Sequence, residues 1–111
     1  MTAEAIKSGR IEKGMSFNEK VWAMTSRVPK GKVTTYAHIA RAMGTKGYRA
    51  VGNALNRNPY SPQVPCHRVV GSDGSLTGFA GGLDKKRAML LREGVKLNGQ
   101  KVDRSSMIKL T

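Results

Sequence analysis

The sequence contains one cysteine, two histidines and seven acidic residues among 111. A single cysteine excludes an internal disulfide, which fits a reducing compartment. One cysteine and two histidines also lack the number and spacing of ligands that a structural zinc site requires. We therefore expect neither a metal nor a cofactor.

Long hydrophobic runs are absent as well. No apolar stretch approaches the 18 residues of an ordinary transmembrane helix, and residues 1–14 carry charges every few positions, unlike a signal peptide. We expect no membrane association and a cytoplasmic protein, or a nuclear one in a eukaryote. The length and the 39% apolar content suffice for one domain with one core.

Acidic residues are few relative to basic ones. Twenty Lys and Arg give a net charge of +13, which attracts polyanions, nucleic acid first and acidic membrane surfaces second. The basic residues are dispersed through a sequence of folded character, so a disordered polybasic arm does not explain them. A soluble basic protein without a polyanionic partner is the simpler alternative, but the charge favours nucleic-acid binding.

The chain divides into a loosely held N-terminal arm at 1–15, one domain at 16–94 and an extended tail at 95–111. Ser16 and Glu19 have the spacing of a capping box, and the apolar residues that follow recur at helical spacing. We predict a helix over about 16–27, ended by Pro29 and Gly31.

A helix-turn-helix is predicted next. Thr34 or Thr35 caps a helix whose apolar residues, from Tyr36 to Met43, lie on one side. A turn at 44–47 leads to a third helix over about 48–57, and two short helices joined in this way form the motif.

The third helix carries polar residues that can contact bases or phosphates, namely Arg49, Asn53, Asn56 and Arg57. It also contains Gly52, although glycine inside a helix costs about 1 kcal/mol relative to alanine. Close approach to a DNA backbone and tight helix packing explain this glycine equally well.

The remaining elements are short. We predict a strand around 67–70, a turn at 71–74, a glycine-rich loop at 77–82 and a last helix, capped by Asp84, that runs through Glu93. The fold class is therefore mostly α, with a helix-turn-helix and a short strand or β-hairpin element.

Pro65-Cys66-His67-Arg68 is the segment most suggestive of chemistry. The thiolate is the reactive form of cysteine, and neighbouring His and Arg favour it. A lone cysteine is more often an inert buried residue. His67 would also need a group that orients it, and Glu93 is the natural acid, unless it is simply a solvated residue at a helix end.

The chain resembles the C-terminal catalytic domain of the O6-alkylguanine-DNA alkyltransferases, also called methylated-DNA–protein-cysteine methyltransferases. The resemblance covers about 16–94, in family order. It rests on the segments Val28–Tyr36, Arg49–Leu55, Arg57–Pro59, Val64–Val70, Gly78–Gly82 and Leu90–Gly94. It implies a winged-helix-like domain that acts as a monomer on double-stranded DNA containing O6-alkylguanine, through the minor groove.

The resemblance assigns the chemistry to four residues. Cys66 would accept the alkyl group, with His67 as its base through a water molecule. Glu93 would orient His67, and Asn58 would hydrogen-bond in the same network. Base extrusion is required because the alkyl group of a stacked guanine is out of reach within the duplex.

Other positions are implied to bind the substrate. Tyr36 would help to turn the guanine out and Arg49 would fill the gap in the stack. The remaining implied DNA contacts are Gly52, Asn53, Arg57 and Arg68. The implied pocket for the guanine consists of Val69, which reads the base edge through its backbone together with Cys66, and of Phe79, Ala80 and Gly81, which close over the base.

Two departures from the family are apparent. Most relatives have tyrosine where this chain has Phe79, and the usual N-terminal domain has no counterpart here. A short architecture is common among alkyltransferase-like proteins, which bind alkylated DNA but usually lack the cysteine. Three hypotheses follow: irreversible alkyl transfer to Cys66, a lesion sensor that recruits other repair factors, and a general basic DNA-binding protein in which the cysteine motif is incidental.

Overall fold

The computed structural model describes residues 2–60, 63–76 and 82–108. Helices dominate the described residues, as predicted, and the fold is mostly α. The α-helices are α1 (Thr2–Ser8), α2 (Phe17–Thr25), α3 (Tyr36–Ala42), α4 (Tyr48–Asn56) and α5 (Leu83–Arg92). The strands are β1 (Thr34–Thr35), β2 (Val69–Val70), β3 (Leu97–Asn98) and β4 (Lys101–Val102), and two 3-10 turns are η1 (Cys66–Arg68) and η2 (Arg104–Ser106).

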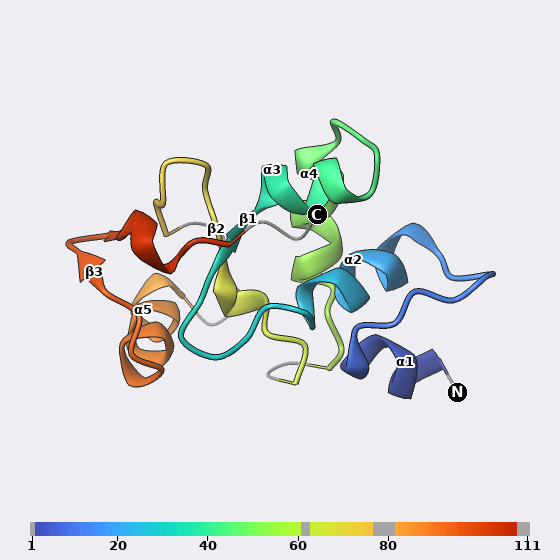
Figure 1. Ribbon diagram of the computed structural model, residues 1–111, viewed down its shortest axis with the longest axis horizontal. Coiled ribbons are helices and arrows are strands. Elements are labelled where there is room, and N and C mark those ends of the chain that lie inside the picture. Colours follow the sequence, from blue (N-terminus) through green and yellow to red (C-terminus); the bar gives the residue numbers. More distant parts are fainter. Residues whose placement is uncertain (1, 61–62, 77–81, 109–111) are drawn as a thin grey trace.

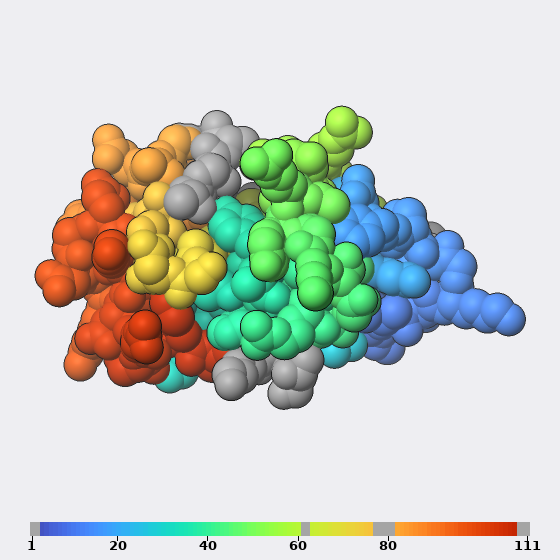
Figure 2. All heavy atoms as spheres, turned by 90° about the horizontal axis from the view of Figure 1, so that it is seen from above, coloured from blue at the N-terminus to red at the C-terminus, as the bar shows by residue number. Residues whose placement is uncertain are grey.

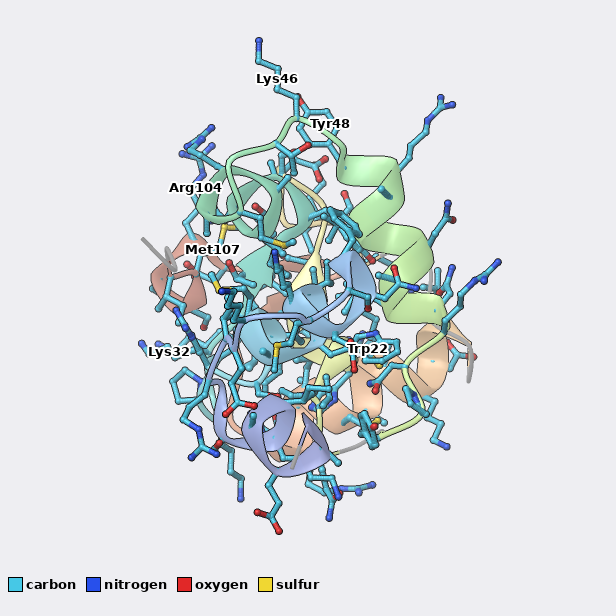
Figure 3. All side chains as sticks on the ribbon, turned by 90° about the vertical axis from the view of Figure 1, so that its right-hand side faces the viewer. Trp22, Lys32, Lys46, Tyr48, Arg104 and Met107 are labelled. Carbon is cyan, nitrogen blue, oxygen red and sulfur yellow. The ribbon has the colours of Figure 1, made fainter. Side chains whose placement is uncertain are left out.

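The predicted helix-turn-helix is formed by α3 and α4. Thr35 caps α3 by accepting a hydrogen bond from the amide of His38 at 3.0 Å. Helix α2 begins with the predicted capping box and packs against α4, where the Trp22 indole donates to the carbonyl of Ala54 at 2.7 Å (Figure 3). A buried cluster joins these helices: Val21, Met24, Ile39, Ala40, Val51, Ala54, Leu55 and Val69.

A short parallel pair connects the helix-turn-helix to the rest of the chain. Thr34 pairs with Val69 and Thr35 with Val70, so the residue before α3 lies beside the segment that follows Cys66. Figure 1 shows this pair at the centre, with α1 and α2 on one side and α5 with the β3–β4 hairpin on the other. A second buried cluster lies on the α5 side: Val33, Val70, Leu76, Leu90, Val95 and Val102.

The ends of the chain differ from the prediction. Residues 2–8 form a helix instead of a loose arm, because Ala5 and Ile6 are fully buried. The described part of the expected tail forms the β3–β4 hairpin and η2, with Val102 buried. Local periodicity missed both ends. The strands are only two residues long, and the cluster that buries Ala5 and Ile6 includes Val64, which is distant in sequence.

Two local predictions are also wrong. Residues 66–68 form a 3-10 turn instead of a strand, because only Val69 and Val70 have a partner strand. The cap of α5 is Gly82, whose φ of 93° favours glycine, and Asp84 lies in the first turn without capping it. None of the described helices is long and apolar enough to cross a membrane.

Candidate functional site

The only cysteine begins the turn η1. Its amide donates to the carbonyl of Val64 at 2.9 Å, and the amide of Arg68 donates to the carbonyl of Pro65 at 2.9 Å. The thiol is half-buried and packs against the cluster of α2, α3 and α4. A 3-10 turn has three residues per turn, so successive side chains point in different directions. Cys66 therefore faces the helix-turn-helix while His67 can face α5.

His67 is buried, with 2% of its surface exposed, and its Nε2 lies 3.0 Å from Oε2 of Glu93. Burial lowers the pKa of His67 below its ordinary value and outweighs the opposing hydrogen bond and charge of Glu93. The imidazole is therefore neutral at pH 7. With Nε2–H donating to the carboxylate, Nδ1 carries a lone pair and acts as an acceptor. Nδ1 is buried and has no hydrogen-bond partner among the described residues.

Glu93, the C-cap of α5, also binds Arg68. The Nε of Arg68 donates to Oε1 at 2.9 Å, and its second terminal nitrogen donates to Oε2 at 2.8 Å. Burial alone would raise the pKa of the Glu93 carboxyl, but the hydrogen bonds and charges of Arg68 and His67 lower it to about 2. Glu93 is thus ionised at neutral pH, and its carboxylate fixes the orientation of His67.

This geometry gives Arg68 a structural role in addition to the predicted DNA contact. Besides its two bonds to Glu93, the guanidinium donates to the carbonyl of Val28 at 2.7 Å. Arg68 therefore faces the interior and holds the segment before β1 against the carboxylate. Its side chain stays 16% exposed, and a DNA contact of Arg68 remains a prediction.

Asn58 is connected to Cys66 by a different route from the predicted one. Its Nδ2 donates to the carbonyl of Val64 at 2.9 Å, the same oxygen that accepts the amide of Cys66. Its Oδ1 accepts from the amide of Tyr60 at 2.9 Å. These hydrogen bonds of Asn58 thus shape the loop before Cys66 and do not extend to His67 or Glu93.

Sequence reasoning missed Lys86. This lysine is fully buried in α5, and its Nζ donates to the carbonyl of Val69 at 2.6 Å and lies 6.0 Å from the centre of the Tyr36 ring. Burial lowers the pKa of Lys86 to about 8, and the proximity of Cys66 opposes that shift. Lys86 is therefore charged at pH 7 and lies near the thiol. The sequence did contain a signal for it. Lys86 lies seven residues before Glu93, which places both residues on one face of a helix.

A pocket of about 570 Å³ opens on the α3–α4 side of the molecule. Figure 2 views this face, with α4 in green beside the yellow turn of residues 71–75. The pocket brings together Tyr36 and four residues of α4 that the sequence singled out: Arg49, Gly52, Asn53 and Asn56. Arg57 does not line it and is exposed beyond the helix end. The lining residues are Tyr36, Ala37, Tyr48, Arg49, Gly52, Asn53, Asn56, Gly71 and Ser72.

The conformation at Gly52 excludes one of its two explanations. A Cβ built on this glycine would meet no atom of the described residues within 4 Å. Tight helix packing is therefore not the reason for glycine at this position. Gly52 lines the open pocket, and close approach of a DNA backbone at this position stays a prediction.

The remaining predicted pocket residues are placed only in part. Val69 is fully buried in β2, and its carbonyl accepts a hydrogen bond from the Lys86 ammonium. Phe79, Ala80 and Gly81 lie outside the described residues. Among the residues that are described, no group of three or more His, Cys, Asp or Glu is arranged to hold a metal ion.

The fold and the site together define a helix-turn-helix domain with a cysteine–histidine–glutamate site next to the surface of its second helix. The model of the family described as 6-O-methylguanine DNA methyltransferase, DNA binding domain, matches residues 16–95. The chain belongs to this family.

Curated and solved relatives agree with this assignment. A methylated-DNA–protein-cysteine methyltransferase from Methanosarcina barkeri is 46% identical over 99 residues, which are 81% of this chain and 63% of the relative. The Mycobacterium tuberculosis OGT in complex with DNA has a TM-score of 0.68 at 38% identity, covering 83% of this chain and 63% of that one. S. pombe Atl1, in complex with damaged DNA containing O6-carboxymethylguanine, has a TM-score of 0.72 at 30% identity. The match covers 84% of this chain and 94% of that one. The chain thus spans less than two thirds of the curated relative.

Proposed function

We propose that the protein repairs DNA by transferring an alkyl group from O6-alkylguanine in a duplex to Cys66. One observation carries the proposal: His67 is buried and neutral and donates to Glu93, so its Nδ1 remains an acceptor in the turn that begins with Cys66. The names of the relatives, methylated-DNA–protein-cysteine methyltransferases, support the same chemistry.

In the proposed step the thiol proton of Cys66 passes through a water molecule to Nδ1 of His67. The thiolate then forms a bond to the alkyl carbon, and the bond between that carbon and O6 breaks. Its electron pair stays on the guanine, which takes up a proton and is restored. The product is a thioether, which lacks an activated carbonyl for water to attack, so each chain reacts once.

Charged groups around the thiol assist this step. In the proposed step the Lys86 ammonium supplies a positive charge near the attacking sulfur. The Glu93 carboxylate stabilises His67 once it has accepted a proton, since a nearby opposite charge favours the charged form. Incubation with a duplex that contains O6-methylguanine, read by protein mass, tests the transfer.

DNA binding is assigned to the α4 surface. Arg49 and Asn53 line the pocket beside Gly52, whose missing side chain allows a backbone to approach closely. Lys46 in the turn before α4 and Tyr48, the first residue of α4, lie at one extreme of the molecule (Figure 3). We infer minor-groove binding by a monomer, with Tyr36 and Arg49 in base extrusion.

Binding should fall steeply with salt. With a net charge of +13, released counterions dominate the affinity, which we expect to drop roughly 10³-fold between about 50 and about 200 mM salt if several phosphates are contacted. A fluorescence-anisotropy titration of a labelled duplex at several salt concentrations measures this. An affinity that hardly changes over the range contradicts phosphate-dominated binding.

Arg49→Ala should slow transfer from duplex DNA far more than transfer from a free modified base such as O6-benzylguanine. The reason is that only the duplex leaves a gap in the base stack to be filled. Arg104→Ala is the matched control, because it removes the same charge from the exposed turn η2, outside the pocket. Equal losses on both substrates would show that Arg49 has no part in extrusion.

The second candidate function is lesion sensing without transfer. The likeness to S. pombe Atl1, of which this chain covers 94%, favours it. The combination of Cys66, His67 and Glu93 favours transfer, because binding alone has no chemical need for a nucleophile held beside an oriented base.

A further inference from the structure

The N-terminal segment lies outside the residues matched by the family model, yet it is built into the fold. Ala5 and Ile6 of α1 are fully buried, and they form one apolar cluster with Met15 and Val64. Trp22 and Tyr60, both partly buried, pack against this cluster. The cluster therefore joins the N-terminal segment to the loop that precedes Cys66.

Val64 connects this cluster to the thiol-bearing turn. Its side chain is fully buried in the cluster, while its carbonyl accepts hydrogen bonds from the amide of Cys66 and from Nδ2 of Asn58, both at 2.9 Å. Any displacement of the Val64 side chain moves the carbonyl that holds the Cys66 backbone. Ile6 thus belongs to the same buried cluster as the residue whose carbonyl holds the Cys66 backbone.

A second contact leads to the same loop. The Lys7 ammonium lies 5.5 Å from the centre of the Tyr60 ring, and the amide of Tyr60 donates to Oδ1 of Asn58. Helix α1 is itself fixed to α2, since Nε of Arg27 donates to the carbonyl of Gly9 at 2.7 Å. The N-terminal segment therefore contacts the loop at two places and is anchored on a helix of the core.

We propose that α1 and Met15 form a brace that positions Cys66 for attack through Val64 and Asn58. This inference rests on the proposed function, in which Cys66 is the reacting group. Helix α1 lies at the end of the molecule opposite Lys46 and Tyr48 (Figures 1 and 3). Loosening the brace should therefore change the chemistry at Cys66 while leaving the DNA-binding surface of α4 intact.

The test compares Ile6→Ala with Val102→Ala. Both shorten a buried aliphatic side chain, but Val102 belongs to the cluster on the α5 side, away from Val64. At saturating duplex with O6-methylguanine, we expect Ile6→Ala to take up methyl about 10- to 100-fold more slowly, the cost of a small misplacement of a reacting group. Val102→Ala should retain the rate of the unmodified protein, and both variants should keep its affinity for the duplex.

Hydrogen exchange separates positioning from a loss of stability. In Ile6→Ala the amide of Cys66 should exchange faster relative to the amide of Val51 in α4 than it does in Val102→Ala. The reaction rate of Cys66 with iodoacetamide should change in Ile6→Ala alone. Equal effects of the two variants on methyl uptake, or an unchanged exchange ratio at Cys66, would overturn the brace.

Two further outcomes remain decisive. If Ile6→Ala does not fold, the milder Ile6→Val is measured in its place, by the same exchange ratio and with the same criteria. If the unmodified protein takes up no methyl group, the proposed function fails. The iodoacetamide rate and the exchange ratio need no DNA, so they still support or overturn the brace.

Discussion

Mixed with an excess of duplex containing O6-methylguanine, the protein should gain one methyl group per chain, on Cys66, and then stop. A thioether is stable to water, so no second turnover is expected. Intact-protein mass spectrometry gives the number of groups, and peptide mapping gives their position. Because Cys66 is the only cysteine, the modified peptide is unambiguous.

Cys66→Ala is the control for this experiment. It should bind the lesion as the unmodified protein does, because binding rests on Tyr36, Arg49 and the basic surface, and it should gain no mass. If the unmodified protein binds tightly and its mass never changes, the sensor hypothesis is correct. Methylation at any residue other than Cys66 would show that the proposed mechanism is wrong.

Glu93→Gln should have the second-largest effect. The substitution removes the charge that pairs with Arg68. Breaking this half-buried ion pair costs roughly 1–3 kcal/mol of folding free energy, between the values for exposed and buried pairs. The substitution also removes the charge that stabilises protonated His67. We expect methyl transfer to slow by roughly 10²-fold, the lower end for loss of general-base assistance.

The difference in unfolding free energy between Glu93→Gln and the unmodified protein should depend on pH in a defined window. The folded-state pKa of Glu93, about 2, lies below its ordinary value of 4.5, so its contribution is complete above pH 4.5. It should be lost progressively as the pH falls from 4.5 towards 2. Urea unfolding at a series of pH values measures it.

Glu12→Gln provides the matched control, since Glu12 is exposed on the segment between α1 and α2. This variant should retain the stability and the transfer rate of the unmodified protein. A stability difference between Glu93→Gln and the unmodified protein that stays constant from pH 5 to pH 2 would contradict the low pKa of Glu93.

The helices of the central region could be predicted because their signals are local. The capping box at Ser16 and the one-sided pattern after Tyr36 each lie within a few turns of chain, so short-range rules suffice. Helix α1 carries weaker signals. Ala5 and Ile6 become core residues through tertiary packing, in a cluster that includes Met15 and also Val64, which lies almost sixty residues later.

The candidate site divides in the same way. Pro65-Cys66-His67-Arg68 is contiguous, so its chemical character is visible in the sequence. The direction of each side chain depends on whether the segment is a strand or a 3-10 turn. The segment is a strand only where it pairs with β1, and only Val69 and Val70 do so.

By itself the sequence determined the basic surface, the helix-turn-helix and the pairing of a lone cysteine with a histidine. Only the tertiary structure decided that Arg68 faces Glu93 and that Lys86 is buried beside the thiol. The physical reason is that both outcomes depend on packing α5 against the turn η1, which are separated in sequence by a loop. A buried charged side chain loses its hydration and needs a specific partner within the protein. The local sequence does not indicate which residue that partner is.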